Sequence, residues 1–226
     1  MNRVLVTGSS RGIGKAIAKC LKDENLFLSG RRFINTDNYF SYDLSDCDNC
    51  KLLFDKAKEY FDSKIDVLIN CAGQYLYNPI EKVKTDEIDY MINLNFKSIY
   101  ILSSLVIPYM KQNNWGRIIN IGSISGMVGE ANASLYSATK SALSGLTRAL
   151  ALETAQNNIT VNQINPGWVD TPLADVLTKV TGATAGNVAI FNSDGTIADS
   201  TVAIATDEEF NTALNAIFPT VSGGGE

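Results

Sequence analysis

The chain has 226 residues, of which 45% are apolar and 19% charged, a composition typical of a single globular domain with a sizeable core. This composition excludes fibrous, collagen-like and wholly disordered proteins. The formal net charge of −5 argues against a nucleic-acid-binding surface, so an anionic cofactor would have to be held by local features.

The amino terminus enters an apolar strand and a glycine turn at once, which leaves no room for a signal peptide. The most apolar long stretch, residues 99–110, contains two serines and a proline. It is shorter than the roughly 20 residues that span a bilayer. We therefore expect a soluble, cytoplasmic protein with no membrane partner and no nucleic-acid partner.

Four cysteines are too few for a disulfide scaffold, and the chain contains no histidine. The lack of histidine excludes Ser-His-Asp hydrolysis and histidine-ligated zinc, so any proton transfer must use Tyr, Lys, Asp, Glu or Cys. Cys47 and Cys50 have the spacing of a metal or redox pair, but no second pair accompanies them. We interpret them as two small residues at a helix start, and we expect no metal.

Apolar runs alternate with helical patterns in the rhythm of βαβ units. Strands are predicted over 4–6, 26–29, 66–70, 117–121 and 160–164, and helices over 12–22, 46–61, 85–93, 95–112 and 136–153. Strands this apolar on both faces belong inside a parallel sheet that helices cover. The fold class predicted is therefore α/β.

The composition changes after Leu173, where a net charge of +1 over residues 1–173 gives way to −6 over 174–226. In this second part we expect a hairpin with strands over 188–191 and 196–198, followed by a short helix over 207–218. The chain is thus predicted to consist of one domain over 1–173 and an atypical tail over 174–226.

A glycine-rich loop lies where the first predicted strand hands over to the first helix. Backbone N–H groups and the positive end of a helix dipole can hold a pyrophosphate there, and the absence of side chains lets the phosphate approach. The candidate cofactor-binding residues of this loop are Gly8, Ser10, Arg11, Gly12, Ile13 and Gly14. The alternative is an ordinary tight turn.

The end of the second predicted strand indicates the cofactor. An acidic residue at this point binds the ribose 2′-hydroxyl of NAD, whereas a basic residue accepts the 2′-phosphate of NADP. Here Ser29-Gly30 is followed by Arg31 and not by a carboxylate, and Arg31 and Arg11 could form a pocket for a dianion. NADP(H) is therefore favoured over NAD(H), although exposed arginines after a strand are also compatible with simple solvation.

Tyr136 and Lys140 are four residues apart, so they project from the same face of a helix about one turn apart. A free tyrosine, with a pKa near 10, is a poor acid–base group at neutral pH. A nearby cation favours the phenolate and lowers this pKa, so Tyr136 is a candidate proton donor. Such a pair also occurs on ordinary helix surfaces, and the surrounding motifs therefore decide its significance.

Taken together, these residues resemble the short-chain dehydrogenase/reductase family, whose motifs occur here in the family's order over residues 1 to about 173. The matching segments are the Thr-Gly-x-x-x-Gly-x-Gly loop at 7–14, Asn70-Cys71-Ala72-Gly73, Asn95, Ser123, Tyr136-x-x-x-Lys140 and Pro166-Gly167. The segment 159–167 is most similar to the branch that contains the 3-oxoacyl-[acyl-carrier-protein] reductases. The resemblance implies a Rossmann-type, doubly wound parallel sheet.

The resemblance also implies a role for each catalytic candidate. Tyr136 is the expected general acid, Ser123 binds the substrate oxygen, and Lys140 lowers the Tyr136 pKa and holds the nicotinamide ribose. Asn95 fixes a water that links Lys140 to solvent, and the nearby Asn93 is a weaker match for this role. The remaining implied cofactor contacts are Asp43 and Leu44 at the adenine, Asn70, Ala72 and Gly73 beyond the fourth strand, and Pro166, Gly167, Val169 and Thr171 at the nicotinamide.

Two functions compete at this point. The first is an NADPH-dependent reductase of a small ketone or a 3-oxoacyl thioester. The second is a catalytically silent nucleotide-binding or structural module, which the atypical tail would favour because the family's usual last strand is missing there. The resemblance also implies a homodimer formed through the helices over 95–112 and 136–153, unless their apolar stripes face only the chain's own sheet, and a tetramer built on the last strand is not expected.

Overall fold

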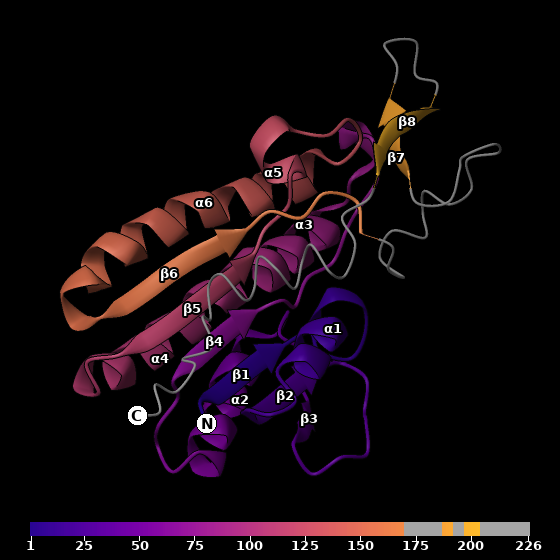
Figure 1. Ribbon diagram of the computed structural model, residues 1–226. Coiled ribbons are helices and arrows are strands. Elements are labelled where there is room, and N and C mark those ends of the chain that lie inside the picture. Colours follow the sequence, from indigo (N-terminus) through magenta and orange to yellow (C-terminus); the bar gives the residue numbers. More distant parts are fainter. Residues whose placement is uncertain (170–186, 192–196, 204–226) are drawn as a thin grey trace. The chain divides into compact units, whose positions relative to one another are not determined.

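The computed structural model describes residues 1–169, 187–191 and 197–203, and it contains a parallel sheet of six strands (Figure 1). The strand order is β3-β2-β1-β4-β5-β6. The strands are β1 (Arg3–Thr7), β2 (Asn25–Gly30), β3 (Tyr39–Ser41), β4 (Val67–Asn70), β5 (Gly116–Ile121) and β6 (Ile159–Ile164). The predicted α/β fold with a doubly wound parallel sheet is confirmed.

One row of side chains crosses five strands and forms the floor of the main hydrophobic core. The strand register places Phe27, Leu5, Leu68, Ile118 and Val161 side by side in this row. All five belong to the same buried cluster. Because alternate residues of a strand point to opposite faces, this row identifies the face on which the helices pack.

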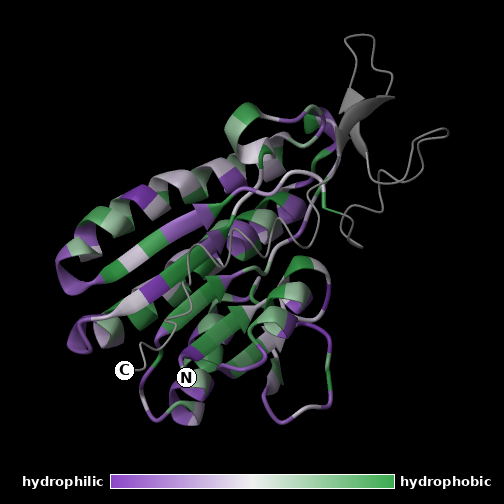
Figure 2. Ribbon diagram, viewed as in Figure 1, coloured by the Kyte–Doolittle hydropathy of each residue, from purple (hydrophilic) through white to green (hydrophobic). Residues whose placement is uncertain are grey.

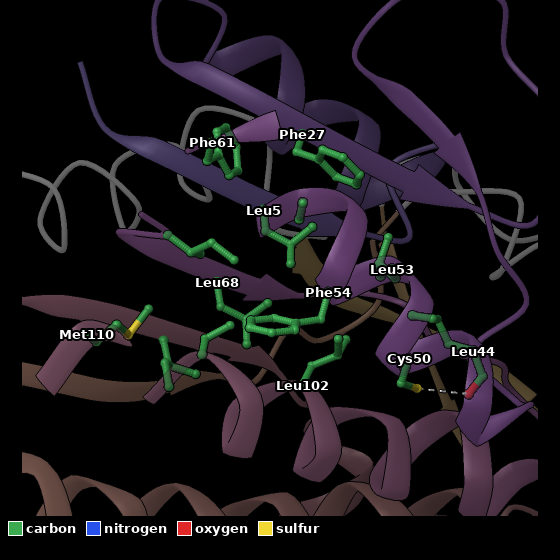
Figure 3. Close-up of a cluster of buried hydrophobic side chains, with 14 of the residues drawn as sticks. Leu5, Phe27, Leu44, Cys50, Leu53, Phe54, Phe61, Leu68, Leu102 and Met110 are labelled. Carbon is green, nitrogen blue, oxygen red and sulfur yellow. Dashed lines mark hydrogen bonds between the residues drawn. The ribbon is translucent and has the colours of Figure 1, made fainter. Parts of the chain in front are cut away.

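Helices cover both faces of this sheet. They are α1 (Gly12–Cys20), α2 (Cys47–Tyr60), α3 (Thr85–Ile92), α4 (Ser98–Gln112), α5 (Ser125–Val128) and α6 (Ser134–Thr154). Leu53 and Phe54 of α2 and Leu102 and Met110 of α4 pack against the row, as Figure 3 shows for Leu5, Phe27 and Leu68. Helix α1 lies on the opposite face beside β1 (Figure 1). The inner strands β1 and β4 are continuously hydrophobic over most of their length, as expected where helices cover the sheet (Figure 2).

The structure differs from the predicted elements in three places that matter for the site. Helix α5, which begins at Ser125, was not predicted. Strand β3 has only three residues, too few for a recognisable pattern, and it was not predicted. The two helices expected over 85–93 and 95–112 form one continuous rod, because a π-helical segment, η2 (Asn93–Lys97), joins α3 to α4. This rod, Thr85–Gln112, is long and apolar enough to pass a composition test for a membrane span. However, Leu102, Val106 and Met110 are buried in the core, as in the core helix of a soluble protein.

The chain divides into two compact units, Met1–Pro166 and Gly167–Glu226. In the second unit, β7 (Asn187–Phe191) pairs antiparallel with β8 (Ile197–Ala203). The predicted hairpin turn over 192–195 and the predicted helix over 207–218 lie outside the described residues.

Candidate active site

The loop between β1 and α1 depends on glycine at two close backbone approaches. Gly8 has a φ of +70°, and a Cβ at this position would lie 2.6 Å from the backbone N of Ala72. A Cβ on Gly14 would lie 2.3 Å from the carbonyl oxygen of Gly8. No side chain caps the start of α1, and its first turn contains no acidic residue. The N–H groups and positive dipole end of this helix are therefore available to an anion, which fits the phosphates of a dinucleotide.

The strands next to this loop carry the other residues expected at the adenosine end. Arg31 directly follows β2, and its guanidinium donates a hydrogen bond of 2.7 Å to the hydroxyl of Tyr90 on α3. The missed strand β3 explains the position of Asp43 and Leu44, which follow its end; Asp43 accepts two hydrogen bonds from Ser45. Arg31, Asp43 and Leu44 thus follow neighbouring parallel strands at the edge of the sheet that also carries the glycine loop.

At the end of β4, side-chain hydrogen bonds hold the segment of Asn70, Ala72 and Gly73. The hydroxyl of Thr7 accepts hydrogen bonds of 3.1 Å from the backbone N–H groups of Cys71 and Ala72, which joins the ends of β1 and β4. The side-chain amide of Asn70 donates to Asn120 at 2.9 Å, and its Oδ1 has no hydrogen-bond partner within the described structure. A buried amide oxygen without a partner is a candidate for contact with a bound ligand.

The three residues expected to carry the chemistry lie close together at the ends of β5 and α6. Ser123 follows β5, and Tyr136 and Lys140 lie one turn apart on α6; each of the three is no more than 8% exposed. Ser123 and Tyr136 interact through a side-chain hydrogen bond. The Lys140 ammonium donates to the carbonyl oxygen of Ile121 at 2.7 Å and lies 5.8 Å from the centre of the Tyr136 ring.

Asn95 lies in the π-helical segment η2 and is fully buried. Its side-chain amide donates to the carbonyl oxygen of Gln74, and its Oδ1 accepts from the N–H of the same residue, both at 2.9 Å. A Cβ on Gly73 would lie 3.4 Å from Asn95 Oδ1 and 3.5 Å from Lys140 Nζ. The two side chains therefore approach the same glycine, as a link between Lys140 and Asn95 requires.

The expected lowering of the Tyr136 pKa is wrong for this structure. Burial is the largest effect and raises the pKa of Tyr136 above its usual value of 10.0; the hydrogen bond with Ser123 lowers it, and the nearby Glu130 and Cys71 raise it further. Burial also lowers the pKa of Lys140 to about 8. The prediction failed because it considered only the neighbouring cation, whereas the cost of removing the charged phenolate from water is the largest effect on the Tyr136 pKa.

Sequence reasoning missed a group of polar residues beside Ser123. Glu130, between α5 and α6, accepts hydrogen bonds from the hydroxyl of Tyr75 at 2.5 Å and from the hydroxyl of Ser125 at 2.7 Å. The Tyr75 ring packs edge-on against the Tyr136 ring, with their centres 4.9 Å apart. The only signal in the sequence was a carboxylate in the loop before Tyr136, which without the fold could not be assigned a partner.

The residues expected at the nicotinamide are only partly described. The carbonyl oxygen of Pro166 accepts a hydrogen bond of 3.1 Å from the N–H of Ile124, so the chain after β6 runs beside the residue that follows Ser123. Gly167 and Val169 begin the second unit, and Thr171 lies outside the described residues.

Comparison with known proteins identifies the family to which this arrangement belongs. The model of the short chain dehydrogenase family matches residues 2–181. The chain belongs to the short-chain dehydrogenase family. It is therefore an oxidoreductase, with a Rossmann-type fold that binds NAD(P)(H).

Similar proteins include two curated short-chain dehydrogenases. The chain is 36% identical over 184 residues to D-beta-hydroxybutyrate dehydrogenase from Cupriavidus necator, covering 75% of this chain and 71% of that protein. It is 35% identical over 189 residues to the 3-oxoacyl-[acyl-carrier-protein] reductase FabG from Rickettsia conorii, covering 77% of this chain and 76% of that protein.

Two solved structures share this architecture. A short-chain dehydrogenase from Streptomyces avermitilis has a TM-score of 0.71 and 29% identity, over 76% of this chain and 68% of that one. A 3-ketoacyl-(acyl-carrier-protein) reductase from Brucella melitensis, complexed with NADH, has a TM-score of 0.70 and 25% identity, over 76% of this chain and 77% of that one.

Proposed function

We propose that this short-chain dehydrogenase reduces the carbonyl group of a 3-oxoacyl thioester or a small ketone, with NADPH as the preferred cofactor. The observation that carries the proposal is the arrangement of Ser123, Tyr136 and Lys140 at the ends of β5 and α6, with Asn95 behind them. The dinucleotide supplies the hydride when it is bound, and the protein supplies orientation and a proton.

The chain's own residues perform the remaining steps. The hydroxyl of Ser123 donates a hydrogen bond to the carbonyl oxygen and stabilises the negative charge that develops on it. Tyr136, whose raised pKa keeps it protonated at neutral pH, donates its proton to this oxygen. The Lys140 ammonium stabilises the resulting phenolate. A proton then returns to the phenolate from solvent by way of Asn95 and Lys140.

Substitution of Tyr136 by phenylalanine tests the proton donor. We expect Tyr136→Phe to lower kcat by at least about 100-fold, because general acid catalysis contributes this much. The dissociation constant for NADPH should stay within about threefold, since only a hydroxyl is lost. Dinucleotide oxidation with a panel of 3-oxoacyl thioesters and small ketones, together with NADPH titration by fluorescence, measures both quantities.

Tyr60→Phe at the end of α2 is the matched control, because its partly exposed ring lies on another helix and is expected to be silent. Equal rates for wild type and Tyr136→Phe would remove Tyr136 from the mechanism. Retained NADPH binding without turnover of any carbonyl by the wild type would favour a nucleotide-binding module instead.

The preference for NADPH is tested at Arg31. No carboxylate follows β2, and a guanidinium matches a 2′-phosphate in charge and geometry. Arg31→Asp should weaken NADPH binding by at least tenfold and leave NADH binding within about threefold, because only NADPH has the phosphate that the new carboxylate repels. Arg32→Asp, at the neighbouring exposed position, is the control. Equal losses for both cofactors after Arg31→Asp would contradict the assignment.

Two further features belong to the same proposal. The protein is proposed to act in the cytoplasm as a homodimer that pairs through α4 and α6. The exposed Tyr100 of α4 and Leu152 of α6 are available for such a contact. Analytical ultracentrifugation of the wild type and of a Tyr100→Glu, Leu152→Glu double variant distinguishes a dimer from a monomer.

A further inference from the structure

The mechanism proposed above assigns no role to the carboxylate of Glu130. Its two carboxylate oxygens are held separately: Oε1 accepts from the hydroxyl of Tyr75 at 2.5 Å, and Oε2 accepts from the hydroxyl of Ser125 at 2.7 Å. Tyr75 belongs to the segment after β4, whereas Ser125 begins α5. A carboxylate with a separate donor on each oxygen keeps one position and orientation.

This position is close to the substrate oxygen. The hydroxyl of Ser123 donates to that of Ser125 at 3.2 Å, so a single hydroxyl separates Glu130 from the residue that binds the carbonyl. The Tyr75 ring, which is held at its hydroxyl by Glu130, packs edge-on against Tyr136. The carboxylate also acts electrostatically on the Tyr136 phenol. Glu130 therefore places a fixed negative charge beside the pair that holds the reacting group.

We propose that Glu130 sets which substrates are accepted according to their charge. It disfavours carbonyl compounds with a carboxylate one CH2 group away from the reacting carbonyl, and it leaves uncharged acyl derivatives, thioesters or esters, as the substrate class. This inference rests on the proposed function, because it concerns the carbonyl held between Ser123 and Tyr136. Two like charges in a partly buried site, where the effective dielectric constant is about 20, repel each other strongly enough over several ångströms to change an equilibrium by about tenfold or more. The Glu130 carboxylate does not repel an uncharged acyl derivative, so the packing of the acyl chain is not affected.

The substrates in the names of two relatives differ in the charge next to the acyl chain. Hydroxybutyrate, in the name of the Cupriavidus necator protein, is itself a carboxylate. The 3-oxoacyl group in the name of the Rickettsia conorii protein is carried on a protein. Glu130 places this chain with the second kind of substrate.

Other groups around Tyr136 could also influence an anionic substrate. These are the Lys140 ammonium, which would attract an anion, and the neutral side chains of Cys71 and Tyr75, whose pKa values burial raises. A decisive experiment therefore changes Glu130 alone and keeps these groups intact.

The experiment compares two substrates with the same reacting carbonyl, acetoacetate and its methyl ester. Initial rates of NADPH and NADH oxidation give kcat/KM for both substrates with wild type and with Glu130→Gln, which keeps the size and removes the charge. We expect the wild type to prefer the ester by at least tenfold. Glu130→Gln should raise kcat/KM for acetoacetate by about tenfold and change that for the ester by less than about threefold. Glu153→Gln, an exposed carboxylate near the far end of α6, is the control and should change neither value.

The outcomes separate this inference from the function on which it rests. An equal fall for both substrates in Glu130→Gln would indicate a merely structural role and overturn the inference, as would an unchanged ratio. A wild type that reduces acetoacetate as efficiently as the ester would overturn it without any variant, which covers the case in which Glu130→Gln does not fold. A wild type that reduces no carbonyl compound at all would refute the proposed function, and the inference with it.

Discussion

At the scale of a single residue, the buried ammonium of Lys140 lowers the stability of the folded protein. The residue is 4% exposed, and its ammonium donates a hydrogen bond to the carbonyl oxygen of Ile121. Burial lowers its pKa from 10.5 to about 8, so the folded protein holds this proton less tightly than the unfolded chain does. Keeping the charge inside the protein at neutral pH therefore reduces stability.

The pH dependence of unfolding tests this cost. Because the unfolded chain binds the proton more tightly, the penalty is fully present below pH about 8 and is relieved as the pH rises from about 8 toward 10.5. The two pKa values correspond to about 3 kcal/mol. We expect urea unfolding at pH 7 to show Lys140→Met as more stable than wild type by up to this amount, with the difference shrinking by pH 10.

Subtracting the variant from the wild type at each pH is necessary, because buried cysteines act in the opposite direction. Burial raises the pKa of Cys50 to about 12 and that of Cys71 to about 11, so these thiols lower stability as the pH rises above 9. A stability difference between Lys140→Met and wild type that does not change between pH 7 and pH 10 would contradict the lowered Lys140 pKa.

At the scale of the elements, the sequence was sufficient where patterns were long and hydrophobic. Five of the six strands of the central sheet, and every covering helix except the four-residue α5, were predicted to within a few residues, because buried parallel strands and amphipathic helices have distinct periodicities. Strand β3 was missed because three residues cannot establish a period, and the π-helical turn at Asn95 because a π turn inside an apolar helix leaves no sequence signal.

The site was predictable to a similar extent. Gly8, Ser123 and Tyr136 could be proposed from the sequence because each belongs to a motif with fixed spacing. Glu130 was not found, because its partner Tyr75 is 55 residues away and only the fold brings the two together. The direction of the Tyr136 pKa was wrong for a related reason, since burial is a property of the folded chain and not of two neighbouring side chains.

At the scale of the whole molecule, a stabilising ion pair and the proposed catalytic residues lie at opposite ends of the parallel strands. The glycine loop and Ser123 follow the carboxyl ends of strands β1 and β5, which run parallel in the sheet (Figure 1). An ion pair between Arg3 and Asp66 lies at the amino ends of β1 and β4. The Arg3 guanidinium donates to both carboxylate oxygens, at 2.6 and 2.8 Å, and the Arg3 N–H donates a third bond at 2.9 Å. The backbone of Asp66 also bonds to Arg3 and Arg117, so this residue ties β1, β4 and β5 together.

Substitution of Asp66 tests this separation. We expect Asp66→Asn to lower the free energy of unfolding by about 2 to 3 kcal/mol, because a largely buried guanidinium pair loses its charge partner. Urea unfolding measures this change. The affinity for NADPH and the kcat for carbonyl reduction should stay the same, because the ion pair lies at the opposite end of the strands from the proposed cofactor site. Glu59→Gln removes the exposed pair with Lys56 and should leave stability unchanged, which makes it the control. A loss of cofactor affinity in Asp66→Asn that matches its loss of stability would show that the two ends are coupled.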